Sequence, residues 1–468
     1  MLSQVISILL TLALIGVLIY IIAENQSPVH TLAWVIAITF LPVIGLILYF
    51  LVGHRPRRRK IISEKELDRL KAITEESQKA HIANPPEEYS RLADMMLSIN
   101  KAFPLKGNSL KPYLEFYPML DDLVADMEKA KDHIHLEFFK FEDDPSGRRV
   151  ADVLMRKVSE GVEVRVQYDD LANLSRKKFY KTLRAAGVQV KPFLALTLPF
   201  ISEDINFRNH RKIVIIDGKV GYVGGMNIAE RYGAGLKWGL WRDTHLRIEG
   251  PSVAELQTSF LSDWRFSGGE LMAEPRYFPQ NAGSGDSLVQ IISSGPMDEW
   301  RPAMQGIVGL ISNARNYVYI QTPYFVPTAA VMLALKNAAL SGVDVRLMIP
   351  FRGDSGSLVT NASKSYISEV IESGIKVWFY KKGFLHSKTV VADDSFTTIG
   401  STNVDVRSYL LDFEINAYIY DRDLALKMKG AFLHDQEDSQ QVSKELWASR
   451  PHFQKFKESL ARLLSPLI

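Results

Sequence analysis

The sequence predicts an α/β protein built from two similar halves that follow a pair of membrane-spanning helices. Three observations lead to this prediction. Two apolar segments without a charged residue open the chain of 468 residues. Strand-like and helix-like segments then alternate in the same order twice, and both series contain the same set of polar residues. Alternating strands and helices are typical of a mostly parallel sheet flanked by helices.

The composition is that of a folded protein with balanced charge. Hydrophobic residues make up 47% and charged residues 23% of the chain, which excludes disordered and collagen-like classes. Cysteine is absent, so disulfides, thiol catalysis and cysteine-ligated metal centres are excluded. The net charge of +3 gives no global electrostatic reason to expect a nucleic-acid partner.

The first predicted domain, 1–53, is a transmembrane hairpin with spans at about 5–23 and 31–53. A helix of roughly 20 apolar residues matches a hydrocarbon layer of about 30 Å. The first span lacks the basic start and cleavage pattern of a signal peptide. The basic run 54–60 predicts that this end, and all that follows, faces the cytoplasm. Whether that run also attracts anionic headgroups is left open.

Breaks in composition predict the remaining boundaries. They are a basic segment and charged connecting helix at 54–109, a first half at 110–273, a breaker-rich linker at 274–286, a second half at 287–440 and a C-terminal amphipathic helix at 441–468. We expect the apolar face of that last helix to pack on the domain rather than on a bilayer. The apolar run 192–201 is either a buried strand or a lipid-facing lip.

The halves repeat each other segment by segment. The stretch 159–166 reads SEGVEVRV and 340–347 reads LSGVDVRL, while 130–137 resembles 314–321 in pattern. In the first of these pairs a glycine, Gly161 or Gly342, ends a helical stretch before the next strand. A duplicated unit of strands and helices therefore accounts for both halves.

Each half contains one copy of the same polar motif. The copies are His210, Lys212, Asp217 and Asn227 in the first half, and His386, Lys388, Asp393 and Asn403 in the second. Strand-like residues follow each histidine, so a histidine and a lysine two positions apart share one face and can share one substrate. Asp217 and Asp393 belong to the predicted catalytic set, although the Asp-Gly pair 217–218 favours a turn-forming role.

These residue types suit a phosphodiester. Two ammonium groups and two amides can hold its oxygens, while one imidazole attacks phosphorus and the other protonates the leaving oxygen. Zinc is a poor fit because lysine is not a usual ligand, and we predict neither metal nor cofactor. Asp243 and Glu414 stand in matching places and are candidates for orienting the two histidines, with surface salt bridging as the alternative.

The doubled HxK-x4-D signature resembles that of the phospholipase D superfamily, over nearly all of 110–440. Within it, the cardiolipin synthases look most similar, on the segments NHRKIVIID (209–217), WRD (241–243) and QTPYFVP (321–327). The resemblance implies that both histidines meet at one site, with His210 as nucleophile and His386 as general acid and then base. It also implies that Glu414 pairs with His210 and Asp243 with His386. One departure is Gly225, where the second copy has Ser401.

The resemblance implies a reaction between two phosphatidylglycerol molecules that gives cardiolipin and glycerol through a phosphohistidine. It also implies a bacterial cell membrane as the location, with a multi-pass anchor and a cytoplasmic catalytic domain. A phospholipase D-type hydrolase that releases phosphatidic acid is the alternative. The predicted spans and near-neutral charge argue against nucleic acid as a partner, and the oligomeric state is left open.

Overall fold

The computed structural model describes residues 2–24, 28–50, 62–195, 206–281, 283, 285–354 and 356–465. The chain divides into two compact units, one of residues 1–59 with 196–206 and the other of residues 60–195 with 207–468. The repeated segments and both polar motifs lie in the second unit. The site must therefore be built within that unit.

In the N-terminal unit the described residues form α1 (Leu2–Ala23), α2 (Pro28–Phe40) and α3 (Pro42–Leu48). The predicted span 5–23 lies within α1. The span 31–53 is not one helix, because the proline that opens α3 lacks the N–H that would continue α2. A search of the described residues finds no helix with the length and apolarity needed to cross a bilayer. The predicted hairpin is therefore not confirmed, and the run 54–60 lies outside the described residues.

The strands of the larger unit fall into two series. The first series is β1 (Leu105–Tyr113), β2 (His133–Phe138), β3 (Glu163–Asp169), β4 (Gln189–Phe193), β5 (Arg208–Asn209), β6 (Lys212–Ile216), β7 (Val220–Gly224), β8 (Leu240–Arg242) and β9 (His245–Glu249). The second is β10 (Ser287–Ser294), β11 (Tyr317–Gln321), β12 (Phe325–Val326), β13 (Asp344–Pro350), β14 (Lys376–Tyr380), β15 (Gly383–Leu385), β16 (Thr389–Ala392), β17 (Phe396–Gly400), β18 (Val404–Asp405), β19 (Asp412–Tyr420) and β20 (Ser439–Gln441).

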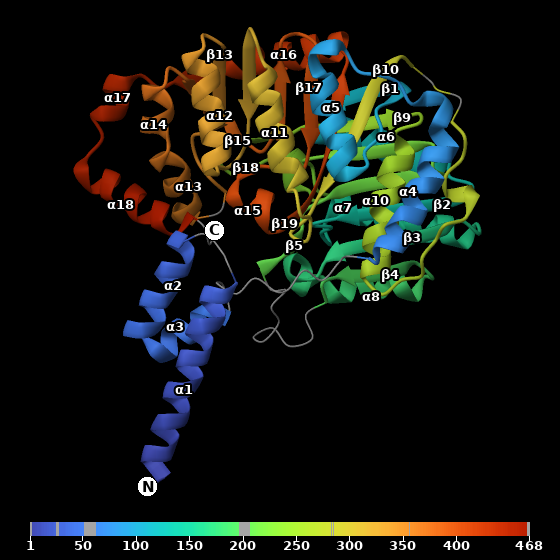
Figure 1. Cartoon of the computed structure of the whole chain (residues 1–468). Coiled ribbons are helices and arrows are strands. Elements are labelled where there is room, and N and C mark those ends of the chain that lie inside the picture. The colour runs from blue at the N-terminus through green and yellow to red at the C-terminus, as the bar shows by residue number, and fades with distance from the viewer. Residues whose placement is uncertain are drawn as a thin grey trace. The chain divides into compact units, whose positions relative to one another are not determined.

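Most strands of both series share one 16-stranded sheet (Figure 1), while β12 pairs with β18 and β15 with β8 in two separate two-stranded sheets. The strand order is β4-β3-β2-β6-β7-β9-β1 in one half and β14-β13-β11-β16-β17-β19-β10 in the other. These are the same order, and the halves join where β1 pairs with β10. The sequence repeat is thus a structural repeat around that junction.

The sheet is mixed, which corrects the prediction of a mostly parallel sheet. The parallel ladder in each half is β2-β3-β4 or β11-β13-β14, while β6, β7, β9 and their counterparts pair antiparallel. The short turns inside the motifs are the reason. Residues 217–219 connect β6 to β7, and a connection this short can join only antiparallel strands.

Helices cover both faces of the sheet. The helices that precede β10 in the chain are α4 (Glu64–Gln78), α5 (Glu87–Asn100), α6 (Phe116–Glu128), α7 (Pro145–Ser159), α8 (Lys177–Ala185), α9 (Arg231–Ala234) and α10 (Val253–Phe266). After it lie α11 (Pro302–Asn313), α12 (Ala329–Leu340), α13 (Gly356–Ser365), α14 (Ile367–Glu372), α15 (Val406–Leu410), α16 (Arg422–Glu437), α17 (Lys444–Ala448) and α18 (His452–Leu463). In β6, Ile213 and Ile215 belong to the core cluster that includes α10, whereas Val214 and Ile216 belong to the one that includes α6 and α7. A strand buried on both faces explains why the motif strands are continuously apolar.

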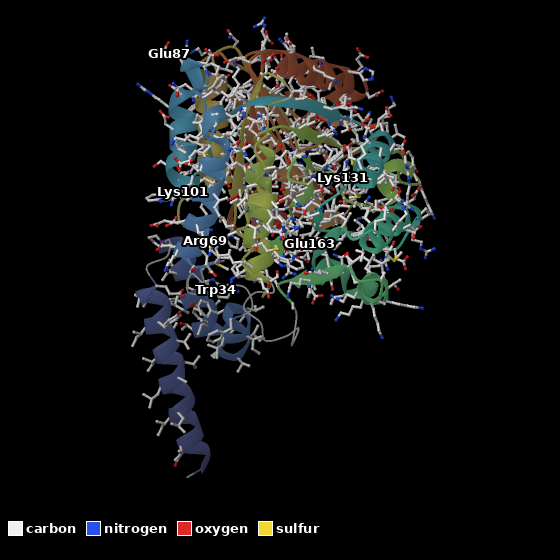
Figure 2. All side chains as sticks on the ribbon, turned by 90° about the vertical axis from the view of Figure 1, so that its right-hand side faces the viewer. Trp34, Arg69, Glu87, Lys101, Lys131 and Glu163 are labelled. Atoms are coloured by element: carbon white, nitrogen blue, oxygen red, sulfur yellow. The ribbon has the colours of Figure 1, made fainter. Side chains whose placement is uncertain are left out.

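The connecting helix α4 is part of the domain rather than a solvated linker. Lys71 donates to Glu255 of α10 at 2.7 Å, and the hydroxyls of Thr74 and Thr258 lie 2.5 Å apart. Figure 2 shows the side chains that fill this unit and labels Arg69 on α4 and Glu87 at the start of α5. One face of α4 is therefore buried against α10, although several of its residues are polar or charged.

The C-terminal helix α18 contradicts the expectation that its apolar face packs on the domain. Phe453, Phe456 and Leu463 are 68%, 64% and 76% exposed, whereas Glu458 and Ala461 are buried. Glu458 can be buried because Arg450 donates to it at 2.8 Å. The helix therefore packs by its other face. For the run 192–201, Phe193 is buried in β4, and 196–201 lie outside the described residues.

Candidate active site

The two motif histidines line one cavity of about 240 Å³, together with Asn227 and Asn403. His210 stands between β5 and β6, and His386 between β15 and β16. Residues from both halves of the sheet form the cavity wall. The central expectation from the sequence, that the two copies converge on one site, is confirmed.

Two short cross-half ladders hold the histidines there. β5 pairs with β19 of the second half, and β15 pairs with β8 of the first. The backbone N–H of His210 donates to the carbonyl of Phe413 at 2.9 Å, and that of His386 donates to the carbonyl of Arg242 at 2.7 Å. Each histidine is thus fixed by the half that it does not belong to.

The residue after each of those carbonyls is a carboxylate that contacts the same histidine. His210 Nδ1 lies 3.0 Å and 3.2 Å from the two oxygens of Glu414, and His386 Nδ1 lies 2.6 Å from Asp243 Oδ2. This is the cross-pairing that the resemblance implies. Both carboxylates are buried, so surface salt bridging is excluded as their role. With Nδ1 donating to a carboxylate, Nε2 of each ring is left for chemistry.

The two lysines lie beside their histidines. Lys212 Nζ donates to the carbonyl oxygen of His210, and Lys388 Nζ donates to that of His386 and lies 2.8 Å from its Nδ1. Burial lowers the pKa of Lys212 to about 7 and that of Lys388 to about 8. The surrounding protein therefore compensates both ammonium groups poorly, and an anionic substrate would stabilise them.

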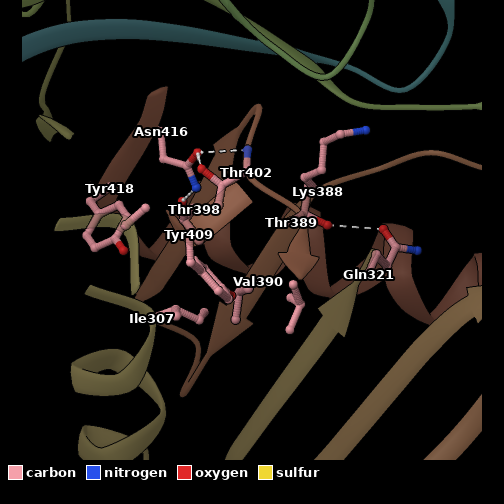
Figure 3. Close-up of a pocket in the computed structure, with 12 residues that line it drawn as sticks. Ile307, Gln321, Lys388, Thr389, Val390, Thr398, Thr402, Tyr409, Asn416 and Tyr418 are labelled. Atoms are coloured by element: carbon pink, nitrogen blue, oxygen red, sulfur yellow. Dashed lines mark hydrogen bonds between the residues drawn. The ribbon is translucent and has the colours of Figure 1, made fainter. Parts of the chain in front are cut away.

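Lys388 borders a second cavity of about 20 Å³ (Figure 3), and neither Lys212 nor Lys388 is among the residues that line the first. The polar wall of the second cavity includes Thr402 and Asn416, joined by a 2.8 Å hydrogen bond, and Thr389, which donates to Gln321 at 3.1 Å. This volume holds no more than a water molecule or two. Of these two cavities, the one that the histidines line can hold a lipid phosphate.

Both imidazoles are neutral at pH 7. Burial and the repulsion of Lys212 and Lys388 lower the pKa of His210 well below its ordinary value, and burial and Lys388 lower that of His386 to about 4. The carboxylates differ from each other. Burial raises the pKa of Glu414 to about 7, whereas for Asp243 the effect of burial is outweighed by Lys388 and His386, and its pKa is lowered. A neutral imidazole is the form that can act as a nucleophile or base.

We expect activity to depend on pH on both sides of neutrality. As the pH rises through about 7, Glu414 loses its proton and can hold Nδ1 of His210, so kcat/KM should rise. Lys212 loses its positive charge in the same range and Lys388 loses its charge at about pH 8, so kcat/KM should fall again above that pH. A plot of kcat/KM from initial rates between about pH 5 and pH 9 should be bell-shaped. Its two limbs report the coupled titration of Glu414 and the two lysines.

Glu414→Gln should remove the acidic limb of that bell and keep the alkaline one. An acidic limb that persists in Glu414→Gln would contradict the assignment of that limb to Glu414. Substrate phosphate should also shift the alkaline limb of kcat upward, because its charge stabilises the protonated lysines.

The two asparagines are placed to donate into the cavity. Asn227 Oδ1 accepts from the backbone N–H of Lys140 at 3.0 Å, and its Nδ2 donates to the Tyr232 hydroxyl at 2.6 Å, which leaves one Nδ2 hydrogen. Asn403 Oδ1 is buried without a hydrogen-bond partner among the described residues. A bound phosphate would accept from either amide nitrogen.

Asp217 and Asp393 are not brought to the cavity, although they were predicted within the catalytic set. The Asp217 carboxylate accepts from the backbone N–H groups of residues 131, 132 and 133 at 2.8–2.9 Å, just before β2. Asp393 accepts likewise from residues 315, 316 and 317 at 2.7–2.9 Å, before β11. Both have a positive φ of 51°. Each aspartate forms the turn after the strand that follows the motif lysine, at the end away from that lysine. Its carboxylate holds the start of the neighbouring strand, β2 or β11.

The cavity wall also contains residues that the sequence analysis did not select: Phe139, Lys140, Arg208, Arg231, Tyr232, Trp241, Tyr324, Asp354, Asp405, Arg407 and Asp412. Aromatic rings flank the histidines, with Phe139 5.1 Å from His210 and Trp241 5.2 Å from His386 between ring centroids. One signal was available for the arginines. Each copy of the motif places an arginine four residues after its asparagine.

Comparison with known proteins settles the family. Residues 123–264 and 307–436 match the family model described as "Cardiolipin synthase, PLD-like domain". A cardiolipin synthase of Listeria monocytogenes is 39% identical over 482 aligned positions, which cover 100% of both chains. The chain belongs to the cardiolipin synthase family. The major cardiolipin synthase ClsA of Bacillus subtilis is also 39% identical and covers 100% of this chain and 99% of its own.

Membership of the cardiolipin synthase family makes this chain a phosphatidyltransferase. Residues 8–54 match a second family model, described as "Phospholipase_D-nuclease N-terminal". Among solved structures, the phosphatidylserine synthase of Haemophilus influenzae aligns with a TM-score of 0.61 and 13% identity, over 80% of this chain and 99% of its own. That similarity shows that the two proteins share a fold, and the family model describes it as phospholipase D-like.

Proposed function

We propose that the enzyme joins two phosphatidylglycerol molecules into cardiolipin and releases glycerol, through a phosphatidyl intermediate on His210. One observation carries this proposal: His210 and His386, each paired with a carboxylate of the opposite half, line a single cavity. Lys212, Lys388, Asn227 and Asn403 would hold the phosphate oxygens. The site residues and their roles rest on this geometry and on the family mechanism.

In the first step, Nε2 of His210 attacks the phosphorus of the donor lipid. The bond from phosphorus to the glycerol oxygen breaks, and Nε2 of His386 gives that oxygen a proton. His386 must be protonated for this step. The anionic phosphodiester favours the protonated form because it offsets the repulsion from Lys388, while Asp243 stabilises the imidazolium.

In the second step, a terminal hydroxyl of the acceptor lipid takes the place of glycerol. Nε2 of His386 removes its proton, the oxygen attacks phosphorus, and the bond between phosphorus and His210 breaks. The products are cardiolipin and the free enzyme. Each imidazole returns to its starting state, and the developing charge on phosphate meets preorganised ammonium and amide groups.

The N-terminal unit would hold the enzyme at its lipid substrate. Charged residues are absent from α1, and the family match at residues 8–54 lies in this unit. We propose a multi-pass anchor in the cell membrane with the catalytic unit in the cytoplasm, and we keep the boundaries 54–109, 110–273, 274–286, 287–440 and 441–468 as proposed. Anchoring raises the local concentration of lipid alcohol and so favours transfer over hydrolysis.

The full chain, purified in detergent and supplied with phosphatidylglycerol and a metal chelator, should release one glycerol for each cardiolipin formed. Thin-layer chromatography of the lipids and an enzymatic glycerol assay measure both products. Accumulation of phosphatidic acid in place of cardiolipin would identify a hydrolase and contradict the proposal.

A further inference from the structure

The two halves of the site differ in one charge. Arg407 pairs with Asp412 at 3.2 Å. The matching arginine of the first half, Arg231, lies instead 5.3 Å from the ring centroid of Trp241. Trp241 and Asp412 occupy equivalent positions, two residues before the carboxylate that orients a histidine. The second half therefore places a carboxyl group beside its arginine, and the first half places an indole ring there.

Lys140 adds a second positive charge to the same wall of the cavity. Over the described residues, neither Lys140 nor Arg231 forms an ion pair, and the buried Nε of Arg231 has no hydrogen-bond partner. Burial and the repulsion of Arg231 lower the pKa of Lys140.

Two acidic groups near this pair contact other side chains, although the charge of Asp354, which lines the same cavity, still favours protonated Lys140. Glu142 pairs with Arg176 at 2.5 Å, and Asp354 accepts from the Tyr324 hydroxyl at 2.7 Å. Two neighbouring cations without a bound carboxylate are suited to an anion.

Arg231 lies on the His386 side of the cavity, and Lys140 lines the same cavity close enough to Arg231 for their charges to repel. Arg231 lies over the ring of Trp241. The centroid of that ring is 5.2 Å from the centroid of the His386 ring, and the Tyr232 ring centroid is 5.8 Å from it. In the proposed reaction the first leaving group, glycerol, is neutral. The acceptor, a second phosphatidylglycerol, then presents the terminal hydroxyl of its glycerol headgroup to His386. Its phosphate is attached to the other end of that glycerol. That phosphate must lie beyond the reacting oxygen, on the same side of the cavity.

We propose that Lys140 and Arg231 bind the phosphate of the acceptor phospholipid. The inference rests on the proposed function and adds how the second substrate is recognised. Binding energy from this remote phosphate positions the acceptor hydroxyl at His386. Water and free glycerol have no such group, so the subsite favours lipid transfer over hydrolysis.

Two reactions of the same enzyme separate acceptor binding from donor chemistry. One is cardiolipin synthesis from phosphatidylglycerol. The other is exchange of radiolabelled glycerol into phosphatidylglycerol, which uses the same donor and histidines but a neutral acceptor. Arg231→Gln and Lys140→Gln should each lower cardiolipin synthesis about 10- to 100-fold. Glycerol exchange should stay close to the wild-type rate, and the proportion of phosphatidic acid should rise.

Two further variants serve as controls. Arg231→Lys keeps the charge and should recover much of the synthesis rate, whereas Lys427→Gln, on an exposed part of α16, should change neither reaction. An equal fall in both reactions would place the cations in donor binding or in the fold and overturn the proposal, as would no change in either. A wild-type enzyme that makes only phosphatidic acid would overturn the proposed function itself, before any variant is compared.

Discussion

Replacing His210 with alanine should lower cardiolipin formation by about 10⁴-fold or more, because the residue that forms the covalent bond to phosphorus is lost. The fold should be unaffected. His210 lines the cavity and its Nδ1–H donates to the carboxylate of Glu414, while its backbone N–H, which donates to the carbonyl of Phe413, is kept in the variant. Rates of cardiolipin formation and thermal unfolding of the purified variant measure the two effects.

His386→Ala is the matched variant, since it removes the equivalent ring of the other half. A phosphatidyl donor with a nitrophenol leaving group needs no general acid, so His386→Ala should still release one nitrophenol per enzyme and retain the lipid on His210. His210→Ala should release none. Mass spectrometry of the acid-labile adduct locates the bond. Substantial turnover by His210→Ala, or an adduct on His386, would contradict the assignment of the nucleophile.

Replacing Gly225 with serine should lower kcat by about 10²- to 10⁴-fold. A Cβ at this position would lie 2.1 Å from Asp243 Oδ1, an oxygen that already accepts from the backbone N–H of Thr244 at 2.7 Å. The carboxylate would have to move and would lose its 2.6 Å contact with His386 Nδ1. Steady-state kinetics of the variant measure the loss.

Two variants test whether the loss comes from that contact. Gly430→Ser, where a new Cβ meets no atom within 4 Å, should be as active as the wild type. Ser401→Gly, which removes a hydroxyl that donates to Glu414, should cost less, about tenfold. Wild-type activity of Gly225→Ser would show that Asp243 does not need its present position.

Positions 225 and 401 also show what a comparison of the two repeats can and cannot predict. The difference between Gly225 and Ser401 is visible in the repeat, where it looks like the loss of one hydroxyl donor. In the structure the first half has no room for a side chain, because Asp243 takes up the space that Ser401 fills in the second half. The reason lies in packing between segments that are adjacent only after folding.

The misplaced expectations have the same origin. Asp217 and Asp393 share the motif with the histidines, yet a strand of extended residues separates the two ends of that motif, and only one end reaches the cavity. The apolar residues of α18 were expected inside because burial is the usual place for them. The face of α18 that is buried instead contains Glu458, which pairs with Arg450.

By itself the sequence determined the repeat, the two sets of histidine, lysine and asparagine, and the strand faces on which they stand, because these follow from spacing along an extended chain. Only the tertiary structure decided which groups meet. His210 and Glu414 are 204 residues apart, and two-residue β5 joins them without any periodic signal. The pKa values of the lysines and the placement of Arg231 beside an indole ring are likewise properties of burial and of neighbours that folding supplies.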